Sequence, residues 1–184
     1  MASSEEPRGG PPAAIEDTGP GVSRRSFLKS VGVTGVVAGV VPWLLTGWDV
    51  RADWGVVRWI GAVLLVAGAL VLLQAFARFV REGAGTPAPV APTERLVVGG
   101  LYRYVRNPMY LAVGAVILGQ ALVLGRAVLF AYLAVFAAAV AAFVLGYEEP
   151  TLRATYGREY DKYVETVPRW IPRLRPRIRG TESG

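Results

Sequence analysis

The 184-residue sequence contains no cysteine and no histidine. Without cysteine, the chain has no disulfide, no thiolate nucleophile and no iron–sulfur ligand. Without histidine, it lacks the commonest general base near neutral pH and the usual zinc ligand, so no metal site is expected. Any catalysis must therefore use carboxylates, tyrosines, arginines, backbone groups and a bound cosubstrate.

Charged residues are also scarce, at 18% of the chain against 53% hydrophobic residues. They are crowded into a few places with long uncharged runs between them, which is typical of a membrane protein. The net charge of +6 comes mostly from arginines that flank the apolar runs. This placement indicates arginines that set the orientation of the membrane helices and contact lipid headgroups, rather than arginines that bind nucleic acid.

Four apolar runs are long enough to enter a bilayer, at about residues 30–47, 55–80, 108–124 and 127–147. After them, apolar and aromatic residues recur at helical spacing on one side of about residues 150–166, with charged residues on the other. This pattern predicts an amphipathic helix in the plane of the membrane interface. The predicted fold class is an all-α integral membrane protein with about four transmembrane helices and a C-terminal interfacial helix.

The ends of the chain and one long loop are polar. Residues 1–26 are rich in Pro, Gly, Ser and Glu and are expected to form a disordered tail, and 173–184 a basic disordered tail. Residues 27–172 then form the membrane domain, with a Gly- and Pro-rich loop at 81–100. Arg and Lys gather at both termini and in this loop. Both termini and the loop are therefore expected on the cytoplasmic side of the inner membrane.

A twin-arginine-like motif, Ser23-Arg-Arg-Ser-Phe-Leu-Lys29, precedes the first apolar run. Such motifs occur in export signals, which would make the run a cleaved signal peptide. The same basic residues suit the cytoplasmic end of a retained helix, which is favoured because no Ala-x-Ala-like cleavage site follows. Gly35 and Gly39 in this run form a GxxxG pair, which allows a helix of this chain or of a second copy to approach closely.

Two polar stretches stand at the ends of the third and fourth runs: Gly100-Leu-Tyr-Arg-Tyr-Val-Arg-Asn-Pro-Met-Tyr110 and Tyr147-Glu-Glu-Pro-Thr-Leu-Arg153. If these runs form a helical hairpin, the stretches meet at one membrane surface. Both have a purely structural interpretation. Asn107 suits an N-cap and Pro108 a first helical turn, and acidic residues suit the N-terminal dipole of a helix that begins at Pro150.

A functional interpretation adds a ligand. The helix N-terminus at Asn107 offers N–H groups to an anion, and Arg106 and Arg153 are suited to bind a carboxylate. Glu148 and Glu149 are suited to hydroxyl groups or a cationic centre. S-adenosylmethionine carries a carboxylate, a ribose diol and a positive centre and fits this set. NADPH is the alternative cosubstrate, but it brings no positive sulfur.

The order of these motifs resembles the isoprenylcysteine carboxyl methyltransferase family, in a bacterial-type integral membrane form. The resemblance spans about residues 86–172 and has four parts: the first polar stretch, an apolar hairpin, Glu-Glu-Pro-x-Leu-Arg-x-x-Tyr-Gly-x-x-Tyr-x-x-Tyr from Glu148, and Val167-Pro-Arg-Trp-Ile-Pro172. That family and the related phospholipid N-methyltransferases are membrane enzymes that use S-adenosylmethionine. The resemblance therefore implies methyl transfer to a lipidic or isoprenoid-linked acceptor.

The resemblance also implies roles for the motif residues. The cofactor would be bound by Tyr102, Arg106, Asn107, Pro108, Tyr110, Glu148 and Glu149. The catalytic residues would be Arg106, Glu148, Glu149 and Arg153. The lipid substrate would be contacted by Tyr156, Tyr160 and Tyr163. Asn107 is a departure, because eukaryotic members usually have histidine there, and this puts the identity of the substrate in question.

A sulfonium methyl group is already activated, so the protein mainly has to align it with a nucleophile and exclude water. A carboxylate acceptor needs no base, whereas an amine would need Glu148 or Glu149 to take its proton. This difference slightly favours O-methylation of a carboxylate. The alternatives are an NADPH-dependent sterol-type membrane reductase, which shares a similar C-terminal hairpin pattern, and a non-catalytic protein that binds anionic lipid through its basic tail.

Overall fold

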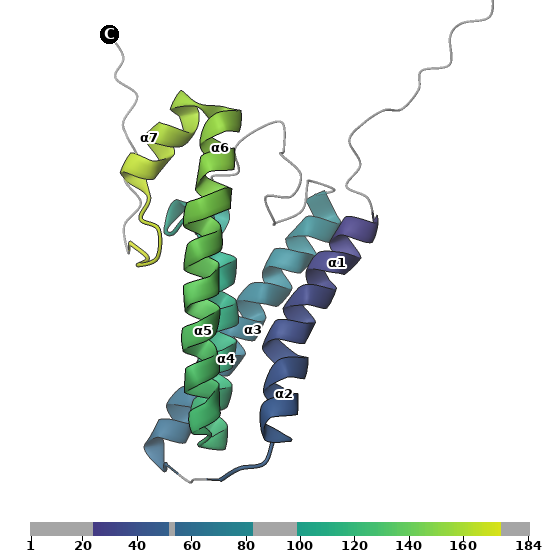
Figure 1. Cartoon of the computed structure of the whole chain (residues 1–184). Helices are drawn as coiled ribbons and strands as arrows, with labels where there is room; N and C mark the ends of the chain where they lie inside the picture. The colour runs from purple at the N-terminus through teal and green to yellow at the C-terminus, as the bar shows by residue number, and fades with distance from the viewer. Residues whose placement is uncertain (1–23, 52–53, 83–98, 174–184) are drawn as a thin grey trace, which may run out of the picture.

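The computed structural model describes residues 24–51, 54–82 and 99–173. Within them the chain forms five helical rods (Figure 1). They are α1 (Arg24–Gly35) continuing through the π-helical turn η1 (Val36–Val40) into α2 (Val41–Thr46); α3 (Val56–Glu82); α4 (Pro108–Leu124); α5 (Ala127–Phe143) continuing through the π-helical turn η3 (Val144–Glu148) into α6 (Glu149–Tyr156); and α7 (Arg158–Thr166). A short 3-10 turn, η2 (Gly100–Arg103), precedes α4.

The two tails and the long loop of the sequence prediction fall mainly outside this range. Residues 1–23, 83–98 and 174–184 lie outside the described residues. The first helix already begins at Arg24, inside the segment expected to be a tail.

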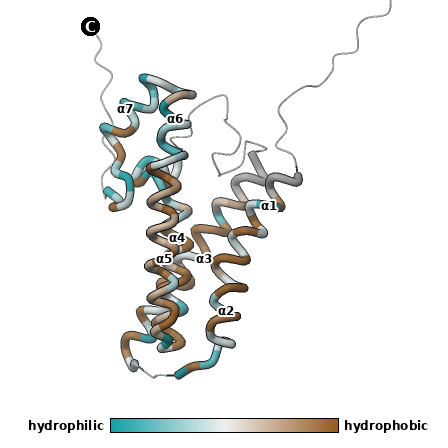
Figure 2. The backbone as a smooth tube through the Cα atoms, viewed as in Figure 1, coloured by the Kyte–Doolittle hydropathy of each residue, from teal (hydrophilic) through white to brown (hydrophobic). Residues whose placement is uncertain are grey.

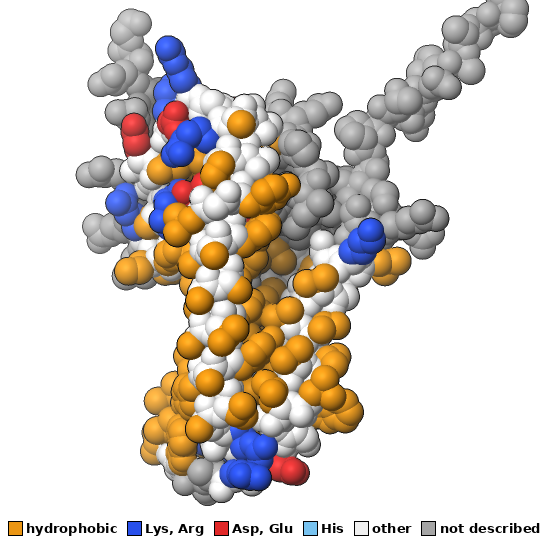
Figure 3. Space-filling model, viewed as in Figure 1, with side chains coloured by type: hydrophobic (Ala, Val, Ile, Leu, Met, Phe, Trp, Pro, Cys, Tyr) orange, Lys and Arg blue, Asp and Glu red, His pale blue; other side chains and the backbone are white. Residues whose placement is uncertain are grey.

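The fold class is confirmed as an all-α integral membrane protein. The segments Leu28–Thr46, Val56–Ala77 and Ala127–Tyr156 are long and apolar enough to cross a membrane, and Pro108–Leu124 is a shorter apolar helix. Hydrophobic residues cover the middle of these helices and polar residues their ends (Figure 2). The space-filling view shows the same division, with charged side chains gathered at the two ends of the molecule (Figure 3).

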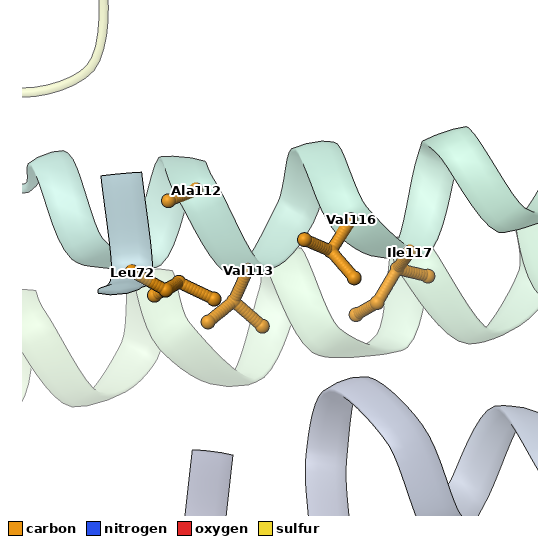
Figure 4. Packing of buried hydrophobic residues seen from close by; sticks show 5 residues of the cluster. All are labelled: Leu72, Ala112, Val113, Val116 and Ile117. Atoms are coloured by element: carbon orange, nitrogen blue, oxygen red, sulfur yellow. The ribbon is translucent and has the colours of Figure 1, made fainter. Parts of the chain in front are cut away.

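The bundle is tightest between α3 and α4. Its main core joins Leu72 of α3 to Ala112, Val113, Val116 and Ile117 of α4 (Figure 4). Lipid tails are as apolar as these side chains, so the two helices are held by close van der Waals packing rather than by removal from water. Small residues at the contact are what make that packing possible.

Gly61 and Gly119 provide the closest approach. A Cβ atom added at Gly119 would lie 2.7 Å from the Gly61 carbonyl oxygen and 2.7 Å from the Leu65 nitrogen. Nothing lies within 4 Å of a Cβ added at Gly35 or Gly39. Among the described residues, the GxxxG pair therefore makes no close helix contact, and glycines of α3 and α4 serve that purpose instead. A contact of the pair with a second copy stays a prediction.

Replacing Gly119 by alanine is expected to lower the free energy of unfolding by about 1–3 kcal/mol, because the new methyl group meets backbone atoms that cannot move aside. Gly114→Ala on the same helix is the matched control. Its Cβ would meet only Leu133 Cδ1 at 3.8 Å and Phe136 Cε1 at 4.0 Å, which is ordinary contact. Thermal unfolding in detergent, followed by circular dichroism, compares the two variants. Equal midpoints for both would contradict the close helix contact.

The first helix is attached to the bundle through its π-helical turn. Tyr132 Oη donates a hydrogen bond to the Val37 carbonyl at 2.8 Å, and Gln120 Nε2 donates to the Ala38 carbonyl at 2.7 Å. A π-helical turn interrupts the regular ladder of backbone hydrogen bonds, which makes such carbonyls accessible to side chains. Polar groups of α4 and α5 thus find partners inside the apolar bundle.

The fourth helix differs from its sequence prediction. It does not end near residue 147, and residues 150–166 do not form one interfacial helix; α5, η3 and α6 are a single rod that ends at Tyr156. A proline ring normally clashes with the carbonyl four residues earlier. The wider π-helical turn, in which the Glu149 N–H bonds to the Val144 carbonyl, takes up Pro150 without a break.

The break comes at Gly157 instead. Its φ of 50° and ψ of −124° lie in a region that favours glycine. Here the chain reverses, and α7 folds back beside α6 (Figure 1). The aromatic side of α7 faces the protein, because Tyr160 and Tyr163 are buried in a cluster with Val167. The aromatic side of α7 therefore packs against the rest of the protein, and the position of α7 in the membrane interface stays a prediction.

Candidate active site

The segment 99–107, which leads into α4, is held by the chain that follows α7. The Arg106 N–H donates to the Pro168 carbonyl at 2.9 Å, and the Arg173 N–H donates to the Tyr104 carbonyl at 3.0 Å. Tyr163 Oη donates to the Tyr102 carbonyl at 2.8 Å. Two segments about 60 residues apart in sequence are thus joined at the membrane end that carries α6 and α7.

Asn107 stands at the N-cap position of α4, as predicted, but its side chain does not cap the helix. It is buried, and its Nδ2 donates to the Arg169 carbonyl at 3.2 Å. Pro108 occupies the first helical position and has no N–H to satisfy. The first turn of α4 therefore presents backbone N–H groups that no side chain caps, at the positive end of the helix dipole.

A buried carboxylate lies at the centre of this end of the molecule. Glu149 Oε1 accepts hydrogen bonds from Arg106 Nη1 at 2.8 Å and from Arg169 Nε at 2.6 Å, and Oε2 accepts one from Arg169 Nη2 at 2.8 Å. The side chains of Arg106 and Glu149 are 9% and 10% exposed. Two guanidinium groups thus neutralise one acid where solvent screening is weak.

The neighbouring acid has different surroundings. Glu148 is half-buried, and its Oε2 accepts a hydrogen bond from Tyr110 Oη at 3.0 Å. Consecutive residues of a helix project about 100° apart, so Glu148 and Glu149 face different neighbours. In the described part of the chain, Glu148 forms no ion pair with a basic side chain. The two adjacent acids are therefore electrostatically distinct.

Tyrosine hydroxyls line the same region. Burial, reinforced by the Glu148 carboxylate, raises the pKa of Tyr102 to about 12. Burial also raises the pKa of Tyr160 and of Tyr163; for Tyr160 the Glu149 carboxylate adds to the effect and the Arg106 guanidinium opposes it. All three side chains are thus neutral hydroxyl groups at physiological pH, able to donate hydrogen bonds.

The structure brings together most of the residues that the sequence singled out. Tyr102, Arg106, Asn107, Pro108, Tyr110, Glu148, Glu149, Tyr160 and Tyr163 all belong to the joined segments or to the helices that they contact. Tyr156 is half-buried at the end of α6, against the aromatic cluster of α7.

Arg153 is not placed with Arg106. Its exposed guanidinium forms an ion pair with Asp161 of α7, with Nε 2.9 Å from Oδ1, and lies over the Tyr160 ring. Arg169 pairs with Glu149 instead, and the sequence prediction did not include it among the site residues. The available signal was its place in the Val167-Pro-Arg-Trp-Ile-Pro172 motif, where an arginine between two prolines follows an amphipathic helix.

Arg106 retains an unused donor. Its Nε is buried and has no hydrogen-bond partner among the described residues. Leaving such a donor unpaired costs about 1–3 kcal/mol or more for a charged group, so the site favours an acceptor at this position. An anionic group on a bound molecule would provide it, beside the uncapped first turn of α4.

Comparison with known protein families places the chain. A family model described as phospholipid methyltransferase matches residues 56–159, which is more than half of the chain. The matched part runs from the start of α3 to the first turn of α7 and includes Arg106 and the two adjacent acids. No curated protein and no solved structure matches the chain.

Proposed function

Because the chain belongs to the phospholipid methyltransferase family and is an S-adenosylmethionine-dependent methyltransferase, we propose that it methylates a lipid acceptor at the membrane surface that carries α6 and α7. The family assignment favours this function over the NADPH-dependent reductase and over the non-catalytic lipid-binding protein. The narrower resemblance to isoprenylcysteine carboxyl methyltransferases concerns the acceptor, which is a separate question.

The donor groups of the site fit the methyl donor, and the observation that carries this proposal is the unpaired Arg106 Nε. S-adenosylmethionine, when bound, supplies an activated methyl group on a sulfonium centre. Arg106 and the first turn of α4 would hold its carboxylate. Glu148, with the hydroxyl groups of Tyr102 and Tyr110, would face its positive centre and hydroxyl groups.

The different surroundings of the two acids support an amine as the acceptor group. Glu149 is neutralised by Arg106 and Arg169, so it is poorly suited to take a proton. Among the described residues, Glu148 pairs only with a neutral hydroxyl, and it is suited to hold an ammonium group and accept its proton. The sequence favoured a carboxylate acceptor because a carboxylate can be methylated without a base. Glu148 can serve as a base, so this reason no longer separates the two acceptors. O-methylation of a lipid carboxylate is the alternative.

The test uses membrane vesicles that contain the full chain and S-adenosylmethionine labelled on its methyl group. Inverted vesicles expose the cytoplasmic face, so they should transfer label to lipid, whereas sealed right-side-out vesicles should not. Mild alkali hydrolyses methyl esters to volatile methanol but leaves N-methyl groups intact, so alkali-stable label would indicate an amine acceptor. Arg106→Ala is expected to abolish the transfer. Equal labelling in vesicles without the protein would overturn the proposal.

We also propose that the first helix is retained. Its removal would leave Tyr132 without the Val37 carbonyl and Gln120 with only a long bond of 3.4 Å to the Val116 carbonyl among the described residues, inside the apolar bundle. Unpaired polar groups in the membrane interior are costly, so the mature fold depends on this helix. The mass of membrane-extracted protein should therefore include residues 24–46. A mass that begins near residue 48 would contradict retention.

A further inference from the structure

We propose that Arg169 is a positioning residue of the cofactor site. It lies outside the region that the family model matches. It holds Glu149 so that Glu149 in turn orients the Arg106 guanidinium toward the carboxylate of the methyl donor. This inference rests on the proposed function. It assigns a role in cofactor binding to the segment that follows α7.

Arg169 makes the stronger of the two contacts with the shared acid. It binds Glu149 through two parallel hydrogen bonds, from Nε at 2.6 Å and from Nη2 at 2.8 Å, whereas Arg106 makes one, from Nη1 at 2.8 Å. A bidentate pair fixes both the distance and the plane of the carboxylate. The direction in which Arg106 points is therefore set by an acid that Arg169 holds.

Pro168 and Arg169 also hold the backbone beside Arg106. The Pro168 carbonyl accepts the Arg106 N–H at 2.9 Å, and the Arg169 carbonyl accepts the Asn107 side chain at 3.2 Å. Arg106 is thus fixed at its backbone by Pro168 and at its guanidinium by Arg169 through Glu149. This double attachment leaves the buried Arg106 Nε as the donor for a ligand.

Exposure separates the two arginines. The Arg169 side chain is 33% exposed, whereas that of Arg106 is 9% exposed. Arg169 is therefore on the wetter side of Glu149, and Arg106 on the buried side. This arrangement suits a residue that acts through Glu149 rather than one that contacts the reacting groups. It also means that Arg169 can be replaced without leaving a large cavity.

The experiment measures binding of S-adenosylmethionine and of S-adenosylhomocysteine to the full chain in detergent by calorimetry. Arg169→Ala is expected to raise the dissociation constant at least about tenfold, because loss of hydrogen bonds between charged groups carries such an effect. Arg169→Lys should weaken binding by less but measurably, since an ammonium group cannot form the two parallel bonds. Added guanidinium ion should restore part of the affinity of Arg169→Ala.

Arg173→Ala is the matched control. Arg173 lies in the same segment, but among the described residues its exposed side chain donates only to the Thr166 carbonyl. Its loss should therefore change the dissociation constant by less than about twofold. Absence of binding by the wild-type protein would overturn the proposed function itself. Wild-type binding with undiminished affinity of Arg169→Lys and Arg169→Ala would overturn only the role of Arg169. So would a loss of affinity that follows the unfolding midpoint and does not respond to guanidinium ion.

Discussion

Replacing Glu149 by glutamine is expected to abolish binding of S-adenosylmethionine and to lower the free energy of unfolding by about 3–5 kcal/mol. The reason is that one buried carboxylate neutralises two arginines, and glutamine keeps its size but not its charge. Arg106 and Arg169 would then repel each other at a site with little solvent screening. Glu149 belongs to α6 and binds both Arg106, which precedes α4, and Arg169, which follows α7. The substitution should therefore also disturb the backbone contacts of Arg106.

The control for this prediction is Asp161→Asn. Asp161 also forms an ion pair, with Arg153, but both side chains are about half exposed, at 52% and 54%. Exposed pairs contribute about 0–1 kcal/mol, so this variant should unfold and bind the cofactor much as the wild-type protein does. Thermal unfolding and calorimetry on both variants provide the comparison. Similar losses of stability and of cofactor affinity in Glu149→Gln and Asp161→Asn would contradict the prediction that the buried ion pairs of Glu149 contribute more than an exposed one.

The transmembrane part of the fold could be predicted where local signals and tertiary structure agree. The third helix runs from Pro108 to Leu124, as expected, because a proline at its first position and Gly125 in the left-handed conformation mark its ends. The fourth helix was predicted too short. The local sequence at Pro150 is typical of a helix start. The rod continues through Pro150 only because of the π-helical turn before it, and no residue pattern predicts that turn.

The sequence singled out most of the residues that gather at the candidate site, but not the pairs that they form. The motifs singled out Arg106 and both acids, because the polar stretches that contain them stand at the ends of two apolar runs that would form a hairpin. Which acid meets which partner depends on the helical phase after the π-helical turn. The role of Arg169 depends on the reversal at Gly157, which brings it to Glu149 across 20 residues of sequence. Spacing along the chain does not encode such a contact.

Replacing Glu148 by glutamine is expected to lower kcat/KM for an amine acceptor by at least about 100-fold, with little change in stability. A general base contributes about 10²–10⁴-fold to a rate, and Glu148 is the acid of the pair that no arginine neutralises among the described residues. Glutamine retains an oxygen that can accept the Tyr110 hydroxyl, so the hydrogen bond at 3.0 Å has a substitute. The unfolding midpoint should therefore change far less than in Glu149→Gln, and cofactor affinity should fall without being abolished.

The matched variant is Tyr110→Phe, which removes the hydroxyl but leaves the Glu148 charge. It should reduce kcat/KM by less than Glu148→Gln does, because the base stays in place and loses one hydrogen bond to its carboxylate, a type of bond worth about 1.5–3 kcal/mol. The rate of Glu148→Gln should also recover as the pH rises toward about 10, where a primary amine loses its proton without a base. Rates measured with labelled methyl donor across this pH range compare the two variants.

The sign of the Glu148→Gln effect distinguishes the two acceptor chemistries. An anionic lipid carboxylate needs no base, and the Glu148 charge would repel it. For such an acceptor, removing the charge should leave kcat/KM unchanged or raise it, at every pH where the acceptor is ionised. A fall of 100-fold that is relieved at high pH supports an amine. An unchanged or increased rate, together with alkali-labile label, would instead establish the carboxylate and leave Glu148 as a group that orients the methyl donor.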